Sequence, residues 1–127
     1  MNKSQEEKMP DLSREELIKI LAISDHPRLA GVDLSGLHLA NLNFANADLT
    51  RANLSGANLS GAYLRSSRME ESNLEGCNFT GANLKEANLK GADLRNADLT
   101  GAILTDTILY GAVLDGAKID RSADYQR

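Results

Sequence analysis

Few side chains in this sequence are of the types that bind metals or attack substrates. Two histidines, His26 and His38, and one cysteine, Cys77, are the only residues of their kinds. A zinc site needs several Cys or His ligands at short spacings. Neither histidine has a cysteine or a second histidine at such a spacing. We therefore expect no metal site.

The acidic residues suggest a second kind of chemistry. Asp and Glu together number 18, and paired carboxylates can act in acid–base catalysis or bind calcium. Many of the Asp residues, however, recur at an interval that Asn shares, which indicates a structural preference. The chain also lacks a phosphate-binding glycine loop and a nucleophile elbow. We predict that the protein is not an enzyme and holds no cofactor.

Length and charge narrow the class of protein. The 127 residues suffice for one domain, and a net charge of −4 argues against nucleic acid or an anionic membrane as a partner. A single cysteine suits a reducing compartment. The polar start of the chain lacks the apolar stretch of a secretory signal, and no run is long enough to cross a membrane. We expect a soluble, cytoplasmic protein.

A period of five residues dominates the sequence. From Leu34 to Ile119, every fifth residue is large and apolar over eighteen consecutive positions. The residue two places earlier is mostly Ala, the residue between them is mostly Asn or Asp, and Gly is frequent two places later. Residues two apart face the same side of an extended segment, and Gly suits a turn. Each unit therefore predicts a short extended side, with a small and a large residue inward, followed by a corner.

This A-(N/D)-L-x-(G/x) pattern resembles the pentapeptide-repeat family, in particular its small members of the cyanobacterial type. The resemblance covers residues 32–121. It implies an all-β solenoid, a right-handed quadrilateral β-helix with four repeats in each coil. The eighteen repeats would then form about 4.5 coils of twenty residues, stacked at roughly 4.8 Å per coil.

A twenty-residue coil predicts which residues stack in the core. Residue n would lie beneath residue n+20, so that the inward columns are apolar throughout. The core residues that we single out are Leu54, Leu74, Leu84, Leu94, Phe44, Phe79 and Met69, together with Cys77 as a small inward residue.

Charged residues offset by twenty support this coil length. Two such pairs are alike in charge, Arg65–Lys85 and Glu86–Asp106. Six are opposite, namely Asp48–Arg68, Arg51–Glu71, Glu70–Lys90, Glu75–Arg95, Arg95–Asp115 and Asp98–Lys118. Opposite charges facing each other on a ladder stabilise it by about 0.2–1 kcal/mol.

The start of the chain is expected to close the first coil. We predict a flexible segment over residues 1–12 and a helical cap with a connector over 13–31. The cap residues are Ser13 and Glu16, which form a capping box, and the apolar Leu17, Ile18 and Leu21. The large residues Val32, Leu37 and Leu42 are expected in part beneath the helix. The alternative is that this helix recruits a partner.

The last coils carry apolar residues in the outward position. Ile103, Ile108 and Val113 replace Asn or Asp there, and Tyr110 lies nearby. One explanation is that the tail, residues 122–127, folds over some of them. The other is an interface, which includes a homodimer through the C-terminal end.

These observations predict a non-catalytic scaffold that presents rigid β-helix faces to a protein partner. The alternative is a DNA mimic acting on DNA gyrase or topoisomerase, as some relatives of this family are. Such a mimic needs a dense acidic surface, whereas the acids here exceed the bases only modestly. A purely structural module is a further possibility.

Overall fold

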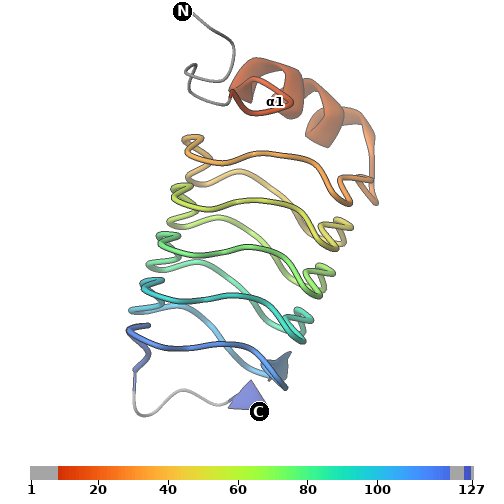
Figure 1. Cartoon of the computed structure of the whole chain (residues 1–127). Coiled ribbons are helices and arrows are strands. Elements are labelled where there is room, and N and C mark those ends of the chain that lie inside the picture. Colours follow the sequence, from red (N-terminus) through yellow and green to blue (C-terminus); the bar gives the residue numbers. More distant parts are fainter. Residues whose placement is uncertain (1–8, 121–124, 127) are drawn as a thin grey trace, which may run out of the picture.

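The computed structural model describes residues 9–120 and 125–126. It contains one helix, α1 (Arg14–Ile23), followed by a stack of short-sided coils and two short strands, β1 (Thr107–Ile108) and β2 (Tyr125–Gln126). Helix α1 lies across one end of the stack, and the two strands lie at the other end (Figure 1).

Parallel bridges hold the coils together. Fifteen of them join residue n to residue n+20, from Arg28↔Asp48 to Asp98↔Lys118. Because a bridge recurs every five residues, four bridges close each coil and the stack has four sides. The ladder starts at Arg28, one repeat before the boundary of 32 that the sequence suggested, and Leu29 is already buried. Pro27 lies in the segment expected to be a connector, but it already takes part in the ladder, because its carbonyl accepts a hydrogen bond from the Asp48 amide at 2.8 Å.

We name the sides by their outward residues. Side A carries Asp33, Asn53, Asn73, Asp93 and Val113. Side B carries His38, Asn58, Asn78, Asp98 and Lys118. Side C carries Asn43, Tyr63, Asn83 and Ile103. Side D carries Arg28, Asp48, Arg68, Asn88 and Ile108.

The repeat satisfies its backbone amides in a fixed way. In the repeat around Leu54, the amides of Asn53, Leu54 and Gly56 donate to adjacent coils at 3.0, 2.8 and 2.9 Å. The amide of Ala57 donates across the turn to the Leu54 carbonyl. The remaining amide, that of Ser55, donates to the Asn53 side chain, Oδ1, at 3.0 Å. Four amides are thus satisfied by backbone and the fifth by the outward side chain.

This fifth hydrogen bond explains why the outward position prefers Asn or Asp. The side-chain oxygen accepts from the amide two residues later at Asp33, Asn43, Asp48, Asn53, Asn58, Asn73, Asn78, Asn83, Asn88, Asp93 and Asp98. The sequence predicts only that this side chain faces outward. It also caps the corner that follows it.

The corners require left-handed backbone. The residue two after each large inward residue has φ between +57° and +74° from Gly31 to Gly116. Glycine, Asn and Asp tolerate this region, but Arg51, Ser66, Glu71 and Glu86 adopt it as well. Each of these four costs about 1–2 kcal/mol relative to glycine's freedom there.

The core is a column of aliphatic side chains with little aromatic content. Leu54, Leu74, Leu84, Leu94, Phe44, Phe79, Met69 and Cys77 are all buried in it. Two of the buried hydroxyl groups have carbonyl partners within the stack: that of Thr107 donates to the Leu84 carbonyl at 2.7 Å and that of Ser72 to the Met69 carbonyl at 2.7 Å, whereas the Ser67 hydroxyl has none among the described residues.

Residues before the first coil occupy the place of a preceding coil. The capping box of Ser13 and Glu16 is formed, Leu17 is fully buried, and Leu21 packs against the core. Two unexpected residues satisfy the first coil's backbone. Asp11 accepts from the Asp33 amide at 2.8 Å and donates its own amide to the Asp33 carbonyl, while the Arg14 guanidinium donates to the His38 carbonyl at 2.9 Å.

The flexible segment expected over residues 1–12 thus has an anchored end at Asp11, and residues 1–8 lie outside the described part. Val32, Leu37 and Leu42 are partly buried against the core. They belong to the coil that lies next to α1 (Figure 1).

At the other end the twenty-residue register changes. Strand β2 pairs in parallel with β1, joining Thr107 to Tyr125 and Ile108 to Gln126. This offset is eighteen residues, so the chain reaches side D by a shorter path than a full coil. The rest of the expected tail, residues 122–124 and 127, lies outside the described part.

Replacing Leu84 tests the inward register. Leu84 is fully buried in mid-stack. We expect Leu84→Ala to lower the free energy of unfolding by about 2–5 kcal/mol and Leu84→Asp to prevent folding, because no partner can neutralise the buried carboxylate. Chemical denaturation followed by circular dichroism measures both. The matched control is Tyr63→Asp, because Tyr63 is exposed on side C, the side of the repeat that contains Leu84. An equal decrease in the free energy of unfolding for Tyr63→Asp would contradict the inward position of Leu84.

Replacing Asn78 tests the corner cap. Its Oδ1 accepts from the Thr80 amide at 2.9 Å and the Thr80 hydroxyl at 2.7 Å. We expect Asn78→Ala to lower the free energy of unfolding by about 1–2 kcal/mol, since the amide loses its acceptor. Asn78→Asp keeps the acceptor and should stay close to the wild type. If urea denaturation shows the same decrease in the free energy of unfolding for both variants, the hydrogen bond from the Thr80 amide to residue 78 does not stabilise the fold.

Candidate interaction surfaces

The side chains that could do chemistry are not gathered into a site. His26 and His38 are exposed, His26 just before the first coil and His38 on side B, whereas Cys77 is buried in the core. Among residues 9–120, no three His, Cys, Asp or Glu side chains are placed to hold a metal ion.

Cys77 is a packed, neutral thiol. Its Sγ donates to the Leu54 carbonyl at 2.8 Å. Burial raises the pKa of the thiol to about 12, so that the thiolate is essentially absent at neutral pH. The side chain therefore serves as a small core residue.

Thiol labelling tests this assignment. At pH 8 the folded protein should react with Ellman's reagent far more slowly than the urea-unfolded protein, because Cys77 is both protonated and inaccessible. A free-cysteine peptide is the control. Rapid labelling of the folded chain would show that the thiol is reachable.

An apolar rim surrounds the C-terminal coils. Ile103, Tyr110 and Val113 have 47 %, 63 % and 42 % of their surface exposed. Ile108 is only half-buried and pairs with Gln126 through its backbone. We call these four residues the C-terminal rim. They lie on sides C, D and A and at the corner between D and A.

The rim also departs from the repeat's hydrogen bonding. Because Ile103, Ile108 and Val113 have no side-chain acceptor, the amides of Thr105, Tyr110 and Asp115 have no cap within the described chain. The apolar residues thus leave a corner amide without a side-chain acceptor and place apolar surface at the outward position.

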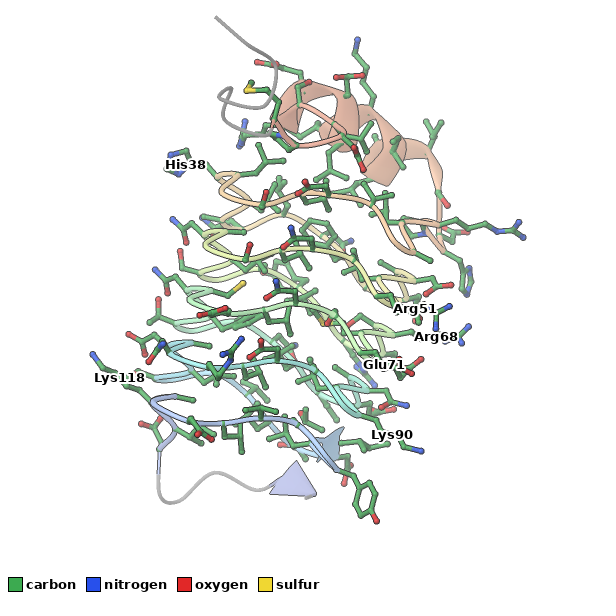
Figure 2. The ribbon with its side chains drawn as sticks, in the orientation of Figure 1. His38, Arg51, Arg68, Glu71, Lys90 and Lys118 are labelled. Carbon is green, nitrogen blue, oxygen red and sulfur yellow. The ribbon has the colours of Figure 1, made fainter. Side chains whose placement is uncertain are left out.

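The charges are divided unevenly among the sides. We call side D with its two flanking corners the D surface. It carries Arg28, Asp48, Arg51, Arg65, Arg68, Glu70, Glu71, Lys85, Glu86, Lys90 and Asp106. These six bases and five acids give a formal charge of +1. The other charges of residues 27–120 are two bases and six acids, giving −4. Figure 2 shows Arg51, Arg68, Glu71 and Lys90 along one edge of the stack and His38 and Lys118 along the opposite edge.

Only two of the six expected ion pairs form. The Arg68 guanidinium lies 4.0 Å from Asp48, and that of Arg95 lies 3.3 Å from Glu75. In the described residues, the other four pairs lie beyond 4.0 Å, although the ladder places them in adjacent coils as expected: Arg51–Glu71, Glu70–Lys90, Arg95–Asp115 and Asp98–Lys118. Other pairs form instead, including Arg65–Glu86 at 3.3 Å and Arg95–Asp93 at 2.7 Å.

Hydrogen bonds within a repeat also hold carboxylates that face the adjacent coil. Asp48 accepts from the Thr50 hydroxyl at 2.6 Å and the Thr50 amide at 3.0 Å, and these bonds hold the pKa of its carboxyl below the usual value. Side-chain hydrogen bonds from Arg95 likewise lower the pKa of Asp93. A carboxylate two residues away has a shorter path to its donor than one in the next coil.

Two hollows lie on the D surface. One, of about 490 Å³, is lined by Thr50, Arg51, Arg68, Glu70, Glu71, Lys90 and Gly91. The other, of about 440 Å³, is lined by His26, Arg28, Ala30, Asn46, Asp48 and Arg68. Arg68 borders both, so the hollows adjoin along side D.

Comparison with known proteins places the fold. The model of the family described as pentapeptide repeats (8 copies) matches residues 28–65, 57–96 and 87–122, which together cover most of the chain. The chain belongs to the pentapeptide-repeat family. The match to the family model begins at residue 28, which is also the first residue of the bridge ladder. The solved structures of this family imply a right-handed β-helix.

Two solved pentapeptide-repeat proteins are similar to this one over most of its length. A protein from the Arabidopsis thaliana thylakoid lumen is 29 % identical, with a TM-score of 0.72 over 80 % of this chain and 72 % of that one. HetL from the cyanobacterium Nostoc sp. strain PCC 7120, a protein involved in heterocyst differentiation regulation, is 27 % identical, with a TM-score of 0.58 over 87 % of this chain and 50 % of that one. No curated protein matches the sequence.

The family assignment concerns the fold and names no partner. Helix α1 is too short and too polar to cross a membrane, and no other helix occurs in the described part of this pentapeptide-repeat protein. The surfaces from which binding can be argued are therefore the C-terminal rim and the D surface.

Proposed function

We propose that the protein is a non-catalytic scaffold that presents the faces of its β-helix to a protein partner. The observation that carries the proposal is the exposed C-terminal rim on a stack whose every coil is tied to the next. Apolar residues exposed together are typical of interaction sites. HetL, a regulatory protein of similar fold, supports a role outside catalysis.

The ends of the stack have different roles in this proposal. The rod consists of the nineteen repeats whose outward residues run from Arg28 to Lys118, with four repeats to a coil, and α1 caps its first coil. Support comes from buried Leu17 and from the polar contacts of Asp11 and Arg14, which replace a preceding coil. The rim at the opposite end is then the surface free to bind, either a different protein or a second copy in a homodimer.

The distribution of charge does not favour mimicry of DNA. A mimic needs a continuous acidic surface, but most bases of the coils gather on the D surface, which has a formal charge of +1. The scaffold proposal therefore stands as the conclusion.

A paired affinity experiment tests the proposal. Tagged wild-type protein and the variant Ile103→Asn/Ile108→Asn/Val113→Asn are incubated with lysate of the source cells, and retained proteins are identified by mass spectrometry. The variant should fold, because each new Asn can cap its corner as the Asn of other repeats does. We expect a specific protein on the wild type that is reduced at least about tenfold on the variant.

Sedimentation of the two purified proteins separates the homodimer from a foreign partner. If the wild type is a dimer and the variant a monomer, the rim joins two copies. A monomeric wild type that retains no protein, or the same proteins as the variant, would overturn the role of the rim.

A further inference from the structure

We propose that the D surface docks an acidic segment of a protein partner, with Arg28, Arg51 and Lys90 as the side chains that receive its carboxylates. This inference rests on the proposed scaffold function and names the chemistry of the partner. It concerns the lateral face of the stack, apart from the C-terminal rim.

The first support is that these three bases are unengaged. Arg28, Arg51 and Lys90 are exposed, and within the described chain none has a carboxylate within 4.0 Å. Arg51 and Lys90 line one hollow and Arg28 lines the other, with Arg68 between them. Arg68 itself retains 63 % exposure of its side chain, so four cations border the two adjoining hollows.

The second support is that Asp48 and Glu70, two of the three acids that line the hollows, contact donors of their own, whereas Glu71 has no ion-pair partner within 4.0 Å among the described residues. Asp48 accepts both donors of Thr50, and Glu70 is mostly buried, 3.4 Å from the Thr50 hydroxyl and 3.8 Å from Arg68. These carboxylates are turned toward Thr50 and Arg68, whereas Arg51 and Lys90 project from the edge of the stack (Figure 2). Glu70 is therefore held away from Lys90, and Arg51 and Glu71 likewise lie more than 4.0 Å apart.

The third support is the backbone. The four residues that adopt left-handed φ without being Gly, Asn or Asp are Arg51, Ser66, Glu71 and Glu86. All four lie in the corners that flank side D. The side chains at these corners are therefore retained against a conformational cost that Gly or Asn reduces at the corners between the other sides, which points to a use for them.

The negative charge of the other three sides favours an acidic ligand at the D surface. With a formal charge of −4 they repel an acidic segment, so approach is favoured only at the D surface. A nucleic acid fits less well, because Asp48, Glu70 and Glu71 lie among the cations and would face a continuous line of phosphates. An extended peptide with acidic residues at alternate positions can place carboxylates at the cations and leave the gaps to Ser or Gly.

Fluorescence anisotropy with a defined probe tests the docking. The probe is a fluorescein-labelled (Glu-Ser)5 peptide at low salt, compared with (Lys-Ser)5 and with a labelled ten-nucleotide thymidine strand. We expect saturable binding of (Glu-Ser)5 only, weakened by added salt. The variant Arg28→Gln/Arg51→Asn/Lys90→Gln should bind at least about tenfold more weakly. Asn is used at Arg51 because it tolerates the left-handed backbone there.

The matched control removes three positive charges elsewhere, as Lys19→Gln/Arg95→Gln/Lys118→Gln, and should bind within about twofold of the wild type. Equal loss in both variants, no binding of (Glu-Ser)5, or tighter binding of the oligonucleotide would overturn the inference. In the lysate experiment, a partner that is retained equally by the D-surface variant would overturn it while leaving the scaffold function intact.

Discussion

The need to satisfy every backbone amide in a twenty-residue coil is the constraint on which the rest of this structure depends. Each repeat sends three amides to adjacent coils and one across its own turn, which leaves one amide at the corner. The outward Asn or Asp accepts from that amide, as Asn53 does for Ser55. The same arrangement requires a left-handed residue next, so that the polar residue and the glycine of the repeat follow from a single geometry.

The ends of the stack meet this constraint differently. At the first coil, the Asp11 carboxylate and the Arg14 guanidinium take the places of backbone groups that a preceding coil would supply. At the last coils, the apolar residues Ile103 and Val113 remove the corner cap and enlarge the exposed apolar surface. A solenoid cannot bury both of its ends by itself, so each end needs its own solution. At one end here the chain itself supplies the missing groups, and at the other Ile103, Tyr110 and Val113 leave apolar surface exposed.

The sides share one backbone but not one surface. Because inward positions are restricted to small and large apolar residues, variation is confined to the outward and corner positions, and charge can be distributed without disturbing the core. Hydrogen bonds within a repeat, such as that from the Thr50 hydroxyl to Asp48, fix the positions of some carboxylates, and several bases of the D surface have no ion-pair partner among the described residues. This is how a chain with a net charge of −4 comes to have one face with a formal charge of +1.

The sequence by itself determined the five-residue unit, the inward columns and the capping box of Ser13 and Glu16, because each depends on a period or a spacing that is visible in one dimension. The tertiary structure alone decided where the ladder begins, the contacts of Asp11 and Arg14, the eighteen-residue offset of β2 and the partners of the charged residues. An offset of twenty residues identifies which side chains are neighbours, but the choice among neighbours is made by distances of a few ångströms. Arg51 and Glu71 are adjacent in the stack and nevertheless unpaired, a result that only the positions of their side chains reveal.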